Sequence, residues 1–145
     1  MFTFSHRVEL AVEALAQLSG RNREWVLARD ISRQTGIPLP YLHKILHAMG
    51  QAGLIVSKRG YRGGVTLARP AENIPLGEVI RAAEGDGRAE QCPLKGIPCA
   101  DVRGCPIHGF WDKTRKDIAD YLNSVTLEMT TDLRCSEEGQ CPSKE

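Results

Sequence analysis

The chain of 145 residues suits one domain, or one domain with a docked appendage. A hydrophobic content of 41% with 26% charged residues is ordinary for a soluble globular protein. The N-terminus turns polar and charged too soon for a signal peptide, and no apolar run approaches a membrane span. We therefore expect a cytoplasmic protein with no membrane partner, a location in which stable structural disulfides are uncommon.

The net charge of +1 conceals an asymmetry along the chain. Residues 1–69 carry 10 Lys and Arg against 4 Asp and Glu, a net charge of +6. Residues 70–145 carry 9 against 14, a net charge of −5. A basic front half indicates contact with a polyanion, although small domains also acquire uneven charge by chance.

Three helices are expected in the front half. The first runs from Ser5, as its cap, to about Ser19, and its apolar residues follow a helical spacing: Val8, Ala11, Val12, Leu15, Ala16 and Leu18. The second runs from about Ala28 to Thr35, and the third from about Pro40 to Ala52. A short helix, a turn containing glycine and a second helix form the helix-turn-helix pattern, which any two helices joined by a turn also resemble.

The surface of the third helix strengthens this interpretation. Its apolar side consists of Leu42, Ile45, Leu46 and Met49. Its other side offers hydrogen-bond donors, among which we expect four to contact DNA: Tyr41, His43, Lys44 and His47. A solvated polar face normally mixes acids with bases, whereas the sequence has no acid between residues 31 and 65. The third helix therefore favours nucleic acid as its partner.

A β-hairpin is expected directly after the third helix. Its strands are Leu54–Ser57 and Val65–Ala68, and they flank a basic turn. The expected DNA contacts of this turn are Lys58, Arg59, Tyr61 and Arg62. A hairpin in this position is a wing that reaches the DNA backbone and minor groove. The alternative is a solvent-exposed hairpin whose charges only prevent aggregation.

The rear half is expected to contain two further helices. A short amphipathic helix lies between Ile74 and Gly85, and a longer one runs from Phe110 to about Ser124. The apolar stripe of the longer helix is Trp111, Ile118, Tyr121, Leu122 and Val125. Since a closed small domain leaves little core for this helix, we expect it to pair with the same helix of a second copy. Thr126 is expected to cap a final turn that includes Met129 and Leu133, and residues 134–145 form a mobile tail.

Between these helices lies a Gly- and Pro-rich loop that carries Cys92, Cys99, Cys105 and His108. Thiolates are soft ligands that suit iron–sulfur clusters, zinc or copper(I). The spacing Cys-x6-Cys-x5-Cys-x2-His lacks the tight knuckle usual in zinc ribbons and fingers. Wider spacing suits a cluster, which is larger than an ion. A zinc site and a cluster-free thiol–disulfide switch remain alternatives.

Three cysteines leave a fourth ligand to be found. His108 is close in sequence, and imidazole replaces thiolate in some iron–sulfur centres. Glu9, on the first helix, is the rival if helices of two protomers cross near the loop. Either residue also has an ordinary explanation, His108 as a helix cap and Glu9 as a surface acid. For Cys135 and Cys141 in the tail we expect no essential role.

Four segments together carry a family resemblance: residues 37–46, 53–65 and 74–80, and the cysteine loop. They resemble the Rrf2 family of bacterial winged-helix regulators. The resemblance implies a mainly α fold, a winged helix-turn-helix with a long C-terminal dimerisation helix. It also implies a homodimer that reads a palindromic operator, and no enzymatic activity. A [2Fe–2S] or [4Fe–4S] cluster on the three loop cysteines would control DNA affinity in response to iron or cluster status, redox state or nitric oxide.

Members of the family differ in the fourth ligand. The type that regulates iron–sulfur assembly uses a histidine that corresponds to His108, and the nitric-oxide-sensing type uses an acid that corresponds to Glu9 of the partner subunit. This chain keeps both residues and has one extra residue between Cys92 and Cys99. The expected organisation is a DNA-binding domain (1–85), a cluster-binding loop (86–108), a dimerisation helix (109–133) and a tail (134–145).

Overall fold

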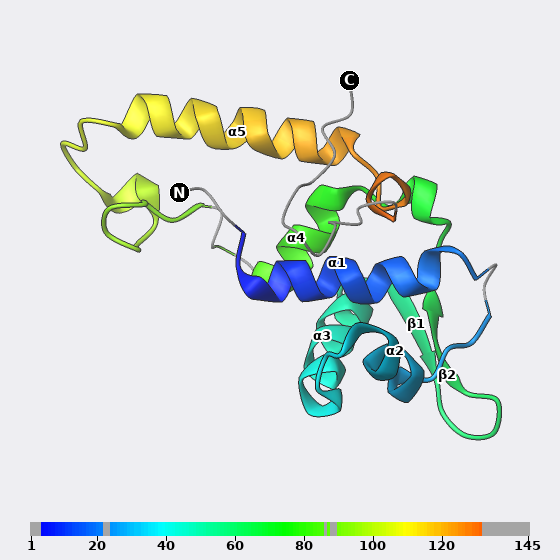
Figure 1. The fold of residues 1–145 in the computed structure, drawn as a ribbon. Coiled ribbons are helices and arrows are strands. Elements are labelled where there is room, and N and C mark those ends of the chain that lie inside the picture. The colour runs from blue at the N-terminus through cyan, green and yellow to red at the C-terminus, as the bar shows by residue number, and fades with distance from the viewer. Residues whose placement is uncertain (1–3, 22–23, 86, 88–89, 132–145) are drawn as a thin grey trace, which may run out of the picture.

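The computed structural model describes residues 4–21, 24–85, 87 and 90–131. These residues form a mainly helical fold with one antiparallel sheet, as the sequence predicts (Figure 1). The helices are α1 (His6–Ser19), α2 (Ala28–Thr35), α3 (Leu39–Gln51), α4 (Leu76–Glu84) and α5 (His108–Ser124). The strands are β1 (Ile55–Lys58) and β2 (Gly64–Leu67).

The hydrophobic core lies where α1, α2 and α3 meet the sheet. Leu15, Ile31 and Ile45 are fully buried, one from each helix. The predicted apolar side of α3 is buried at all four positions, which confirms the orientation of this helix. On α1, Val12 and Ala16 are only partly buried and Ala14 is buried instead. The buried stripe is turned because α1 lies against α4 as well as α3.

The expected helix ends are correct to within two residues. Ser5 is the N-cap of α1, as expected, but its side chain makes no capping bond; its backbone N–H donates to Glu84 Oε1 (3.0 Å). Thr126 is not the N-cap of the final turn, because the 3-10 helix η4 (Glu128–Thr130) begins after Leu127; only the Thr126 carbonyl takes part, accepting from the Met129 N–H (3.1 Å). Leu127 is fully buried, and its N–H donates to the Ile74 carbonyl (2.8 Å). At the start of α1 and at the start of η4, hydrogen bonds to distant segments therefore take the place of side-chain capping.

The hairpin pairs Ile55 with Leu67 and Lys58 with Gly64. Each strand lies one residue closer to the turn than expected, so Lys58 belongs to β1 rather than to the turn. Val26, just before α2, adds a bridge to β2: its N–H donates to the Val65 carbonyl (2.9 Å), and the Val65 N–H donates back (2.8 Å). The sequence did not predict this third element of the sheet.

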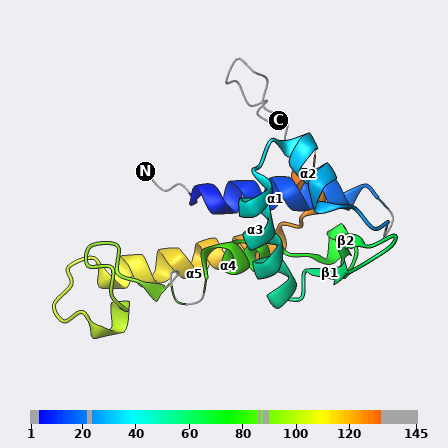
Figure 2. The ribbon, with the colours of Figure 1, turned by 90° about the horizontal axis from the view of Figure 1, so that it is seen from below.

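Helix α5 extends beyond the winged helix (Figures 1 and 2). Its second half lies against α4, and the cysteine loop lies beside its first half in both views. It begins at His108, two residues earlier than expected, and none of its residues is fully buried. Leu133 and the tail with Cys135 and Cys141 lie outside the described residues. No helix in the described ranges is long and apolar enough to cross a membrane.

Candidate functional site

The polar side of α3 is open to solvent. Tyr41, His43, Lys44 and His47 are all exposed, opposite the buried apolar side. The His47 ring is held by Gln51, whose Nε2 lies 3.2 Å from His47 Nε2. Helix α3 and the hairpin project from the same side of α1 (Figure 1). This arrangement presents the predicted helix contacts and the hairpin to one partner surface.

The hairpin carries its four predicted contact residues on an exposed surface. Tyr61 is 88% exposed, and the Arg62 guanidinium lies 5.5 Å from its ring centroid. Lys58 Nζ lies 5.8 Å from the ring centroid of Trp25, and Arg59 is exposed at the turn. The three cations belong to the turn end of the hairpin, and none has a carboxylate partner among the described ion pairs. Such a cluster suits phosphate groups.

Sequence reasoning missed Trp25, which is exposed beside the base of the wing. It precedes Val26, the residue bridged to β2, so its ring is brought to the same end of the sheet as Lys58. A single tryptophan in a connecting segment gives no periodic signal, and only the pairing of Val26 with Val65 reveals its position.

The cysteine loop is folded tightly enough to bury two thiols. Cys92 is 1% exposed and Cys99 is 2% exposed, while Cys105 is partly exposed. A closed turn holds the first of them: the Cys92 N–H donates to the Ile97 carbonyl (2.8 Å), and the Gly96 N–H donates to the Cys92 carbonyl (2.8 Å). The sulfurs of Cys92 and Cys99 are therefore enclosed in an irregular segment with no ladder of strands around it.

The structure brings His108 to the cysteines. Its Nδ1 lies 3.3 Å from Cys99 Sγ, at the first turn of α5. Burial raises the pKa of the Cys99 thiol, and negative charge on Cys92 and Cys105 adds to this rise, while the nearby Arg115 opposes it. The three sulfurs thus share one electrostatic neighbourhood. No three His, Cys, Asp or Glu side chains among the described residues lie close enough together to hold one metal ion.

Glu9 is not part of this cluster within one protomer. It is exposed on α1, where its carboxylate accepts a hydrogen bond from His6 Nδ1 (3.0 Å). Its predicted role requires the loop of a second copy, so it stays a prediction.

Asp112 and Arg115, two charged residues of α5 near the loop, were not identified from the sequence. Arg115 donates from Nε to Asp112 Oδ1 (3.1 Å) and from Nη2 to the same oxygen. Lys116 Nζ donates to the other carboxylate oxygen of Asp112, Oδ2 (2.6 Å). Hydrogen bonds from Lys116 and Arg115 lower the pKa of the Asp112 carboxyl. Their spacing from His108 on one helix, four and seven residues, was the available signal.

The cysteine site fits an anionic, sulfur-rich group. Three cysteines and a histidine are a donor set for a cluster. In addition, Nη1 of Arg115 is buried and has no hydrogen-bond acceptor among the described residues. A buried unsatisfied donor is unfavourable, and an anionic acceptor in the loop would satisfy it.

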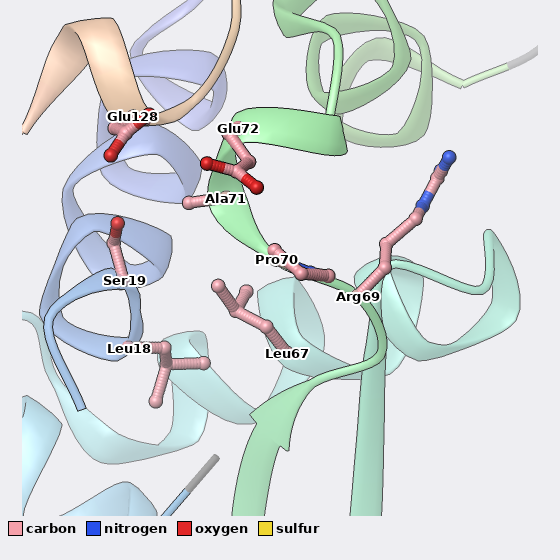
Figure 3. A pocket seen from close by; sticks show the side chains of 8 residues that line it. All are labelled: Leu18, Ser19, Leu67, Arg69, Pro70, Ala71, Glu72 and Glu128. Carbon is pink, nitrogen blue, oxygen red and sulfur yellow. The ribbon is translucent and has the colours of Figure 1, made fainter. Parts of the chain in front are cut away.

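A pocket of about 410 Å³ lies elsewhere, between the end of α1, β2 and η4 (Figure 3). Leu18 and Leu67 lie on one side of it and the carboxylates of Glu72 and Glu128 on the other. Arg69 points away and is paired with Glu78. The pocket shares no residue with the candidate DNA surface or the cysteine loop.

Comparisons with known proteins agree with this architecture. Residues 4–132 match the Rrf2 family, described as an iron-dependent transcriptional regulator. The regulator IscR of Vibrio parahaemolyticus is 38% identical over 104 residues, 71% of this chain and 61% of that protein. The structure of T. potens IscR has a TM-score of 0.67 and 29% identity, covering 99% of this chain and 94% of that one. B. subtilis CymR, the global cysteine regulator, shares the fold with a TM-score of 0.70 at 22% identity, covering 93% and 100%.

The family match spans the winged helix, the cysteine loop and α5. The relatives are named as transcriptional regulators and not as enzymes. The chain therefore belongs to the Rrf2 family of winged-helix, DNA-binding transcriptional regulators.

Proposed function

We propose that the chain is a homodimeric transcriptional regulator whose affinity for a palindromic operator is controlled by an iron–sulfur cluster. Cys92, Cys99 and Cys105 would hold the cluster, with His108 or Glu9 of the partner subunit as the fourth ligand. The observation that carries the proposal is the contact between Cys99 Sγ and His108 Nδ1 (3.3 Å), next to a second buried cysteine. When bound, the cluster would supply a centre that responds to iron, redox state or nitric oxide.

The spacing of the cysteines supports a cluster over zinc. A zinc ion needs four ligands within about 2.0–2.3 Å of one point, and zinc ribbons and fingers usually supply two of them from a tight Cys-x2–4-Cys knuckle. The spacing Cys-x6-Cys-x5-Cys lacks this knuckle. Wider spacing suits a cluster, which is larger than an ion.

A thiol–disulfide switch is the alternative. The close approach of His108 Nδ1 to Cys99 Sγ favours it, because an imidazole next to a thiol can assist proton removal. Burial opposes it, because it raises the Cys99 pKa and keeps the thiol protonated, whereas the reactive form is the thiolate. A bound metal group would stabilise the thiolate without requiring solvent access.

Anaerobic purification tests the cofactor. We expect a coloured protein with iron and acid-labile sulfide, and we expect Cys92→Ala, Cys99→Ala and Cys105→Ala each to lose both. The matched control is Cys135→Ala with Cys141→Ala, which should keep the full visible absorbance. Zinc in place of iron and sulfide would support the zinc site instead of the cluster. A metal-free protein that forms a disulfide would support the thiol–disulfide switch.

The fourth ligand is tested in the same preparation. If His108 is the ligand, His108→Ala shifts the visible and electron paramagnetic resonance spectra and Glu9→Ala does not. If Glu9 of the partner subunit is the ligand, the two variants exchange these results. Unchanged spectra in both variants would remove both residues from the ligand set.

On the DNA side, we propose that α3 lies in the major groove and the wing lies along the backbone and minor groove. The exposed donors of α3 and the unpaired cations of the wing support this arrangement.

Arg59→Ala should weaken binding to all sequences and reduce the slope of log affinity against log salt by about one, because a phosphate contact is lost. The control is Lys113→Ala, which removes a cation of α5, outside the proposed DNA surface, and should leave both the affinity and its salt dependence unchanged. His43→Ala should instead change which operator sequences are preferred.

The domain boundaries follow from this assignment. The winged helix (1–85) binds DNA, the loop (86–108) holds the cluster, and residues 109–133 pair the protomers. Such a regulator acts on chromosomal DNA in the cytoplasm. The loop joins the winged helix to the pairing helix, so a change in the loop reaches both the DNA surface and the spacing of the two half-sites.

A further inference from the structure

One face of α5 lies against the cysteine loop. His108, Asp112 and Arg115 recur at intervals of four and three residues, which places them on the same side of the helix. His108 contacts Cys99, so this side faces the loop. Figures 1 and 2 show the loop beside this first half of α5, beyond the winged helix. Asp112 and Arg115 are partly buried, whereas Lys113 and Lys116 of the same helix are exposed.

Asp112 fixes the orientation of the Arg115 guanidinium. Nε and Nη2 of Arg115 both donate to Oδ1 of Asp112, with an Nε–Oδ1 distance of 3.1 Å. Lys116 Nζ donates to the other carboxylate oxygen (2.6 Å), so the carboxylate is held from two sides. The planar guanidinium leaves Nη1 directed away from Asp112. This nitrogen is buried and has no acceptor among the described residues.

The missing acceptor must be anionic or strongly polar, because a buried guanidinium N–H group without a partner is unfavourable. Besides Asp112, the sulfurs of the cysteine loop are a source of negative charge near Arg115. The charge of Arg115 acts on the Cys99 sulfur, where it opposes the effect of burial. Thiolates and the sulfides of a cluster both accept hydrogen bonds from such donors.

We propose that Arg115 is a positioning residue of the cysteine site, whose Nη1 hydrogen-bonds a sulfur atom of the iron–sulfur group and is aimed there by Asp112. This inference rests on the proposed function and extends it to a residue outside the ligand set. Hydrogen bonds and positive charge next to the sulfurs stabilise the more reduced, more negative state of a cluster. Arg115 therefore raises the reduction potential and slows the loss of the cluster.

The test compares anaerobically purified full-length variants by redox titration, visible circular dichroism and the rate of cluster loss to a chelator. Arg115→Leu should have a more negative midpoint potential and lose its cluster about 10-fold faster or more. Arg115→Lys should shift the potential less, because it keeps the positive charge but lacks the planar, rigid donor geometry of the guanidinium. The midpoint potential and the rate of cluster loss of Asp112→Asn should lie between those of the wild type and Arg115→Leu. Lys113→Leu removes an exposed cation of the same helix and should match wild type.

The outcomes separate this inference from the function on which it rests. A wild-type protein without iron and sulfide overturns both together. A wild-type protein with a cluster, whose potential, dichroism and loss rate are unchanged in Arg115→Leu, overturns only the role of Arg115. The role of Arg115 is also overturned if Arg115→Leu changes the oligomeric state but keeps the potential, the dichroism and the rate of cluster loss. In that case, Nη1 of Arg115 serves the subunit interface instead of the cluster. Arg115→Lys keeps the test valid if Arg115→Leu folds poorly.

Discussion

At the scale of single residues, Gly64 joins the wing to the helical core. Its φ of 143° lies in a region that side chains rarely adopt, and a Cβ atom there would lie 2.5 Å from the Val26 carbonyl oxygen. The two backbone bonds between Val26 and Val65 hold the segments at this close distance. A residue without a side chain is therefore needed at the base of the wing.

Gly64→Ala should destabilise the protein by roughly 2–3 kcal/mol, because the backbone strain and the clash with Val26 add together. Urea denaturation measures the change. Gly20→Ala is the matched control: Gly20 has a φ of −83° and nothing within 4 Å of a Cβ atom, so its substitution should be nearly neutral. Equal effects at the two positions would contradict the packing argument.

At the scale of elements, α4 and α5 meet at one glycine. A Cβ atom on Gly77 would collide with Oδ1 of Asn123, a side-chain atom, while the Asn123 backbone nitrogen would lie at an ordinary 3.5 Å. The close approach anchors the second half of α5 and leaves its first half for the cysteine loop.

Gly77→Ala should cost about 1–3 kcal/mol of unfolding free energy, as overpacking does. Because the colliding atom ends a flexible side chain, Asn123→Ala in the same chain should recover most of this loss. A double-mutant cycle by thermal or urea unfolding measures the coupling. Additive effects of the two substitutions would show that the helices separate instead of accommodating the methyl group.

The wing and the connection before α2 form a second pair of elements. Lys58 lies over the ring of Trp25, so the wing base holds this cation in a fixed position. Trp25→Ala should weaken DNA binding about two- to fivefold, which corresponds to the ~0.5–1 kcal/mol of an exposed cation–π contact. Trp25→Phe retains an aromatic face and should lose less. Fluorescence anisotropy with operator DNA at several salt concentrations is the measurement. An equal loss of affinity in both variants would show that the contact of Lys58 with an aromatic ring does not contribute to binding.

At the scale of the whole molecule, α5 carries an apolar surface that the described chain does not cover. Phe110 is 73% exposed, Tyr121 is 70% exposed and Ile118 is 42% exposed. By helical spacing, Phe110 and Tyr121 lie on the face opposite His108 and Arg115, and Ile118 lies between these two faces. An apolar stripe on a projecting helix indicates a protein partner, and a second copy of the same helix is the partner that we propose.

Tyr121→Glu should raise the dimer dissociation constant by roughly 30-fold or more, the ~2 kcal/mol of a central interface residue. Sedimentation measures this, and Lys113→Glu, off the apolar stripe, is the control. Affinity for the palindrome should fall further than affinity for a half-site, because two linked DNA-binding units act together only in the dimer. A monomeric wild-type protein would contradict the pairing of α5.

Much of the fold could be predicted from the sequence because its signals are local. The helical period placed the buried side of α3 correctly at Leu42, Ile45, Leu46 and Met49, and glycines marked the C-terminal end of α2 and the turn of the wing. The spacing of Cys92, Cys99 and Cys105 identified the candidate site. The expectations that were wrong concerned neighbours: Thr126 is not the N-cap of the final turn, the Ser5 side chain makes no capping bond, and the stripe of α1 is turned toward α4.

By itself, the sequence determined the kinds of elements, the identity of the soft ligands and the basic surface of the wing, because periodicity, thiol chemistry and charge belong to residues and their near neighbours. Only the tertiary structure decided that Val26 joins β2, that Trp25 holds Lys58, and that His108 contacts Cys99. It also decided that Arg115 is enclosed beside the loop with one donor unused. These contacts join segments that are far apart in the chain or depend on burial, and neither separation nor burial leaves a repeat in the sequence.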